Sequence, residues 1–342
     1  MVPGSIPSII LAVFCKQQCI FTRLMKLNRN IKIFINYFLG PLLFIWLAWS
    51  IYRQIKNQPG LEQAWQGIKE SLGRPMLFNL IVVVLLMVVN WSIEAIKWRL
   101  SIKDIQQVSF FKALQAVLSG VSFAVSTPNR MGEYLGRVLY MNEGSRLKTI
   151  SITIVGSISQ LIITLWMGLI GLLILKNGII GQQLVSAMWM NVILYGVVAT
   201  IIFLTLFYFR LSWLVKLVER FNATLLLKLL SLSLLRFAVF IVQYYMLFQL
   251  FGVDVLWWQT FWTVSVSFLV MAVIPTIAIA ELAQRGKILI AIVSLYTANE
   301  LGITLATAGI WFINLIIPAV VGSLLILRIK KIMKGNKDYA KH

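Results

Sequence analysis

The sequence predicts an all-α polytopic membrane protein with about six full spans and two re-entrant helical hairpins in inverted-topology repeats. Three observations support this fold class. Hydrophobic residues make up 60% of the 342 residues and charged residues only 12%, and the mean hydropathy is +0.87, unlike soluble domains. Apolar runs long enough to cross a bilayer recur along the whole chain. A short charged motif follows a proline in each half, as is typical of duplicated membrane folds with broken helices.

Apolar runs predict nine helical segments, and six of them are long enough to span the hydrocarbon core. The runs around Pro128 and Pro275 are shorter, because proline interrupts a helix. These shorter runs form either three short full crossings, which gives nine spans, or two re-entrant hairpins over 110–145 and 258–298. In chain order the runs are 33–52, 76–96, 110–126, 149–175, 189–209, 229–252, 258–274, 286–298 and 302–327.

The distribution of Lys and Arg favours the two hairpins. Cytoplasmic segments are enriched in these residues, and five of them precede residue 33 while six follow residue 327. We therefore expect both termini in the cytoplasm, the first hairpin entering from that side and the second from outside. The halves 33–175 and 189–327 then have opposite orientations. The basic loop 53–75 is the exception, since this arrangement places it outside.

The chain is expected to hold one transmembrane domain, over residues 31–328, because no long stretch is polar enough for a separate globular domain. Residues 329–342 form a basic tail. Residues 1–30 form an N-terminal extension, in which Met25 resembles a natural cytoplasmic start. Residues 1–24 are then either a product of start-codon choice or an interfacial helix.

Composition also argues against several functions. The net charge of +20 comes from residues beside apolar segments, which set topology and attract anionic lipids, so we expect no nucleic-acid partner. Cys15, Cys19 and His342 are the only cysteines and histidine, so we expect no metal site and no disulfide framework. There is no phosphate-binding Walker A loop. We expect no cofactor and no catalytic residue.

The first charged motif follows Pro128. Pro128 cannot continue a helix, and Asn129 is a good N-cap for a half-helix beginning near Arg130. The amides and the positive dipole end at such a helix start favour an anion, and the Arg130 guanidinium can hold a phosphate through two hydrogen bonds. Glu133 and Arg137 lie four residues apart, with the acid first, so we expect them to pair.

The second charged motif follows Pro275, where Glu281 and Arg285 repeat the four-residue spacing. In the first motif, Gly132 and Gly136 also have a spacing that permits close helix packing. Ionisable groups at membrane depth usually face a cavity or pathway, so the sequence predicts a polar site built from both motifs. The alternative is that these charges are structural and pin broken helices to their neighbours.

Two further charges are candidates for the same site. Arg236 lies in the cytoplasmic half of the run 229–252, and Glu94 lies near the cytoplasmic end of the run 76–96. Arg236 either extends to the membrane interface or pairs with Glu94.

The stretch Thr127–Arg137 resembles the lysylphosphatidylglycerol synthase transmembrane family, also called flippase-like domain proteins. The hydrophobic layout is similar over about residues 30–330, which corresponds to the whole stand-alone domain. In the second half the family's glycine-rich pattern is absent, although Pro275 and Glu281 fit it. The matching positions of the first motif are Pro128, Arg130, Gly132, Glu133 and Arg137.

The resemblance implies translocation of an aminoacylated phospholipid, or of a polyprenyl-linked or glycosylated lipid. It implies no synthase activity, because that activity belongs to a separate cytosolic domain of the relatives. Our first hypothesis is a lipid flippase of the bacterial inner membrane, with phospholipids as partners. Arg130 and Arg137 would engage the headgroup phosphate, and Glu133 and Glu281 would serve as counter-ions or proton-coupled switches. The alternatives are a non-transporting scaffold for an enzyme of envelope biosynthesis, and an enzyme that acts on a lipid headgroup.

Overall fold

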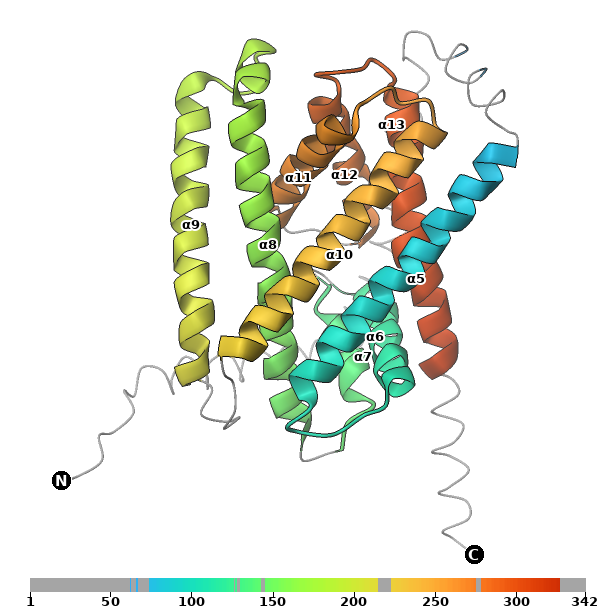
Figure 1. Cartoon of the computed structure of the whole chain (residues 1–342), viewed down its shortest axis with the longest axis vertical. Helices are drawn as coiled ribbons and strands as arrows, with labels where there is room; N and C mark the ends of the chain where they lie inside the picture. Colours follow the sequence, from blue (N-terminus) through green and yellow to red (C-terminus); the bar gives the residue numbers. More distant parts are fainter. Residues whose placement is uncertain are drawn as a thin grey trace, which may run out of the picture. The chain divides into compact units, whose positions relative to one another are not determined.

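The computed structural model describes Glu62, Gln66 and residues 74–125, 127, 130–142, 145–214, 223–274 and 278–326. The chain divides into two compact units, Met1–Trp49 and Ser50–His342, and all described residues belong to the second. The predicted extension 1–30, the run 33–52 and the tail 329–342 lie outside the described residues. The described part is helical and contains no strand (Figure 1), so the all-α prediction is confirmed there.

Five stretches within the described residues are long and apolar enough to cross a membrane, so the chain is a multi-pass integral membrane protein. They are Leu77–Ile102, Lys148–Gly181, Ala187–Phe209, Ala223–Leu250 and Glu300–Ile326. The helices are α5 (Arg74–Ile102), α6 (Phe110–Val125), α7 (Gly132–Val138), α8 (Arg146–Gly181), α9 (Ala187–Leu214), α10 (Ala223–Leu250), α11 (Trp257–Val273), α12 (Ala278–Val293), α13 (Glu300–Trp311) and the π-helical turn η4 (Phe312–Ile316).

The helix boundaries differ from the apolar runs where charged residues are buried. The run 76–96 ends before Lys97, but α5 continues to Ile102, and Lys97 is buried inside the bundle. The run 286–298 begins late because Glu281 and Arg285 reduce the local hydropathy, whereas α12 already begins at Ala278. Apolar runs thus underestimate the length of helices that carry buried ion pairs.

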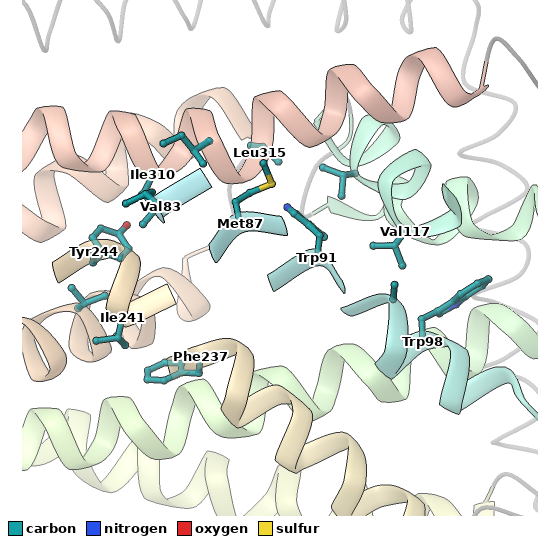
Figure 2. Packing of buried hydrophobic residues seen from close by; sticks show 14 of the residues in the cluster. Val83, Met87, Trp91, Trp98, Val117, Phe237, Ile241, Tyr244, Ile310 and Leu315 are labelled. Carbon is teal, nitrogen blue, oxygen red and sulfur yellow. The ribbon is translucent and has the colours of Figure 1, made fainter. Parts of the chain in front are cut away.

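Helices α5 and α10 pack against each other in antiparallel directions at the centre of the core. Near one end of the contact, Gln243 Nε2 of α10 donates to the carbonyl oxygen of Val83 over 2.9 Å. Farther along α5, the earlier α10 residue Arg236 donates to Asn90 Oδ1 over 2.6 Å. Figure 2 shows apolar side chains of this core, and those that it labels come from α5, α6, α10, α13 and η4.

Helix α7 packs closely on α6 through glycines. A Cβ atom at Gly136 would lie 2.5 Å from the backbone nitrogen of Gly120, and one at Gly132 would lie 2.3 Å from the carbonyl oxygen of Phe123. Real Cβ contacts are not this short, so both positions require glycine. The close packing predicted from the spacing of Gly132 and Gly136 is therefore present, and its partner is the preceding helix.

The order of a long helix, a short helix pair and a second long helix occurs twice, as α5, α6–α7, α8 and as α10, α11–α12, α13 with η4. In Figure 1 the α6–α7 pair lies toward the lower end of α8 and α10, and the α11–α12 pair toward the upper end. Glycine contacts also repeat between the halves. A Cβ atom at Gly168 of α8 would lie 3.1 Å from the carbonyl oxygen of Ser265 on α11. A Cβ atom at Gly322, which follows η4, would lie 2.0 Å from the carbonyl oxygen of Leu118 on α6.

Candidate functional site

Glu94 on α5 is the centre of a buried ion cluster. Its carboxylate accepts from Lys97 Nζ at 2.9 Å, from Arg137 Nη2 at 2.9 Å and from Arg236 Nη1. The Glu94 side chain is only 6% exposed. A carboxylate is stable at such burial only when it is paired and hydrogen-bonded, and here three cations from three helices compensate it. Of the two alternatives for Arg236, the structure shows the pairing with Glu94.

The pair Glu133 and Arg137 forms as the spacing predicted, because α7 places them one turn apart. Arg137 Nη2 donates to Glu133 Oε1 as well as to Glu94. The Glu133 side chain is 24% exposed, so this carboxylate is more accessible than that of Glu94.

Glu281 on α12 is the centre of a second cluster. Arg130 Nη2 donates to both of its carboxylate oxygens, over 3.0 and 3.1 Å, and Arg285 Nη2 donates to Oε1. Arg285 Nη1 also donates to the hydroxyl oxygen of Tyr244 on α10 over 3.2 Å, and its guanidinium lies 5.6 Å from the centre of the Phe268 ring. The predicted pair Glu281–Arg285 is therefore present and is fixed to α10.

Arg130 connects the two short helix pairs. It lies two residues before the start of α7, yet its guanidinium is bound to Glu281 on α12. Its φ angle is +56°, in the left-handed region that residues other than glycine rarely adopt. Such strain persists where surrounding contacts require it and is frequent at ligand-binding positions. The side chain is 43% exposed while Glu281 is 9% exposed, so Arg130 is the accessible member of this ion pair.

The start of α7 differs from the prediction. The helix begins at Gly132, and the Gly132 amide donates to Thr127 Oγ1 over 2.7 Å. Pro128 and the predicted N-cap Asn129 lie outside the described residues. Because Thr127 already accepts from this amide, and α7 has only seven residues, anion binding here would depend on guanidinium groups rather than on a helix start.

Four buried donors of the two clusters and of α5 have no acceptor among the described residues. They are Asn90 Nδ2, Trp91 Nε1, Arg137 Nε and Arg285 Nε. A buried donor without an acceptor destabilises a fold by about 1–3 kcal/mol, and such groups are rare in folded proteins. The two motif arginines share this property, since each uses its Nη2 for its glutamate and leaves Nε–H unpaired.

Lys97, Asn90 and Tyr244 were not identified as site residues from the sequence. A signal for the first two exists on α5, where Asn90, Glu94, Lys97 and Ser101 follow each other at spacings of four, three and four. This spacing places polar residues on one helix face, and all four are buried. Tyr244 carries no such signal, because a tyrosine in an apolar helix is usually a packing residue.

A cavity of about 480 Å³ lies on another face of α5 and contains no residue of either cluster. Its lining consists of Ile96, Arg99, Leu100, Lys103, Gln107, Val108 and Ser109. Within the described residues, no group of three His, Cys, Asp or Glu side chains could hold a metal ion. The guanidinium and ammonium groups of the two clusters can bind and release charged oxygen groups.

Comparison with known proteins gives no match, either to a family model or to a curated protein.

Proposed function

We propose that this protein is a lipid translocator of the bacterial inner membrane, with both termini in the cytoplasm. Its cargo would be a phospholipid or polyprenyl-linked lipid with a charged headgroup. The observation that carries the proposal is the bond between Arg130 and Glu281, which joins the two short helix pairs within a bundle of apolar helices. The resemblance of Thr127–Arg137 to the lysylphosphatidylglycerol synthase transmembrane family supports the same function.

The short helices support re-entrant hairpins over full crossings. Helices α6, α11 and α12 have 16, 17 and 16 residues, and 17 helical residues are only about 25 Å long. The hydrocarbon core is about 30 Å thick. The antiparallel packing of α5 and α10, and the repeated glycine contacts, support inverted-topology repeats. In such folds the substrate binds between the repeats, near the bilayer midplane.

The ion pairs provide a mechanism for the proposed translocation. A headgroup phosphate can replace Glu281 as the partner of the exposed Arg130 through charge-assisted hydrogen bonds. Glu281 keeps Arg285, which remains bound to Tyr244. Binding of the headgroup therefore breaks the ion pair between the two hairpins, which allows them to move relative to each other. The lipid changes leaflet without a change in its covalent structure.

The test is leaflet movement of fluorescent phospholipids and polyprenyl phosphates in proteoliposomes, with mass spectrometry of the recovered lipid. We expect Arg130→Gln to slow movement by about tenfold or more, because a charge-assisted hydrogen bond contributes about 1.5–3 kcal/mol. Lys287→Gln is the matched control, since Lys287 is exposed on α12 and the substitution removes the same charge. An absence of movement by the wild-type protein over the whole panel would reject the proposal.

A scaffold for an enzyme of envelope biosynthesis is the second candidate. The observation that favours it is that all three carboxylates of the clusters are already paired, as expected of purely structural charges. This candidate predicts that Arg130→Gln and Glu281→Gln weaken folding or assembly, and that the wild-type protein moves no lipid.

A further inference from the structure

The two ion clusters contain more positive than negative charge. The Glu94 cluster has the cations Lys97, Arg137 and Arg236 against two carboxylates, Glu94 and Glu133. The Glu281 cluster has Arg130 and Arg285 against one carboxylate. Counted over the described residues, each cluster therefore carries one excess positive charge, and the two clusters together carry two.

This excess is held mostly by buried groups. The side chains of Lys97 and Arg137 are each 3% exposed, and those of Arg236 and Arg285 are 12% and 14% exposed. Water screens such charges poorly, and an unpaired buried charge is destabilising. Arginine remains charged under all ordinary conditions. A negatively charged ligand is therefore the natural complement of the site.

Unpaired donors accompany the excess charge in both clusters. Arg137 Nε and Arg285 Nε are buried and have no acceptor among the described residues. Each cluster therefore contains one charged N–H group without an acceptor, on α7 in the first cluster and on α12 in the second. Arg130, whose side chain is 43% exposed, is the most accessible cation of the two clusters.

We infer that the site selects a doubly negative headgroup, a phosphate monoester carried on a lipid, and rejects cationic aminoacylated headgroups. This inference rests on the proposed function and specifies its substrate class. A dianionic phosphate balances both excess charges, a phosphodiester balances one, and a zwitterion balances neither. A headgroup with a net positive charge adds a third uncompensated charge to a site of low dielectric.

The test measures binding to the full-length protein in a neutral detergent, independently of transport. The probes are dioctanoyl forms of phosphatidate, phosphatidylglycerol, phosphatidylcholine and lysylphosphatidylglycerol, with inorganic phosphate as the lipid-free source of the same anion. Near pH 8 phosphatidate carries about two negative charges, because the second pKa of a phosphate monoester is about 6. We expect it to bind at least about tenfold more tightly than phosphatidylglycerol, with the other two lipids weakest.

Variants and pH provide the controls. Arg285→Gln should weaken phosphatidate binding by about tenfold or more, while Lys287→Gln should leave it unchanged. Arg285→Lys keeps the charge and should retain part of the affinity, which separates loss of charge from loss of folding. At about pH 5 phosphatidate becomes a monoanion, and its advantage over phosphatidylglycerol should disappear.

Three results would overturn the inference. They are equal binding of phosphatidate and phosphatidylcholine, tighter binding of lysylphosphatidylglycerol, or an equal loss of affinity in Lys287→Gln. Inorganic phosphate binding as tightly as phosphatidate would reject a lipid as the ligand. Selective binding of phosphatidate without leaflet movement would reject the translocator and support the dianion site. Leaflet movement of a cationic lipid alone would support the translocator and reject selection of a doubly negative headgroup.

Discussion

Arg130 and Glu281 lie 151 positions apart in the sequence, yet Arg130 Nη2 donates to both carboxylate oxygens of Glu281, over 3.0 and 3.1 Å. No other described ion pair joins the α6–α7 pair to the α11–α12 pair. We expect Arg130→Gln to leave the free energy of unfolding within about 1 kcal/mol of the wild-type value, because partly exposed ion pairs contribute little. Reversible unfolding in mixed micelles measures this free energy. A loss of stability as large as that typical of breaking a fully buried ion pair would contradict the prediction.

Glu94→Gln should be severely destabilising. The substitution leaves Lys97, Arg137 and Arg236 without their shared carboxylate, and removal of one partner from a buried ion pair typically costs about 3–5 kcal/mol. The measurement is the free energy of unfolding in mixed micelles. Glu133→Gln is the matched comparison, since Glu133 is more exposed and pairs with Arg137 alone among the described contacts. An equal loss in both variants would show that Glu94 is not the centre of the cluster.

Gly136→Ala should disrupt the packing of α7 on α6. The added Cβ would lie 2.5 Å from the Gly120 backbone, and overpacking of this kind costs about 1–3 kcal/mol. Gly196→Ala on α9 is the control, because a Cβ there has no neighbour within 4 Å. Thermal stability of the two purified variants, measured side by side, decides the prediction, and unchanged stability in Gly136→Ala would refute the close contact.

Tyr244→Phe should weaken the attachment of α12 to α10. It removes the hydroxyl oxygen that accepts from Arg285 Nη1 and adds a second unpaired donor to that guanidinium, at a cost of about 1–3 kcal/mol. Tyr245→Phe is the control, because the neighbouring Tyr245 packs edge-on against Trp257. Hydrogen exchange of α12 should rise in Tyr244→Phe and stay unchanged in Tyr245→Phe. Equal exchange in both would remove the role assigned to Tyr244.

The pairs Glu133–Arg137 and Glu281–Arg285 could be predicted because their geometry is local. Residues four apart on a helix lie on one face, whatever the rest of the fold does. The contact between Arg236 and Glu94 was one of two alternatives, because the sequence only indicates that both residues lie near the ends of long apolar runs that are expected on the same side. The start of α7 could not be predicted. The side chains of Thr127 and Asn129 can each accept a hydrogen bond from the first amide of the helix, and only the path of the backbone selects between them.

The sequence by itself determined that the chain is helical and embedded in a membrane, because hydropathy and helical spacing act over neighbouring residues. Only the tertiary structure decided which charges from different helices compensate each other. The assembly of Lys97, Arg137 and Arg236 on one carboxylate requires that α5, α7 and α10 meet at one depth. The bond from Arg130 to Glu281 requires that the two short helix pairs meet. Contacts of this kind depend on how whole helices pack, and no spacing within one segment encodes that packing.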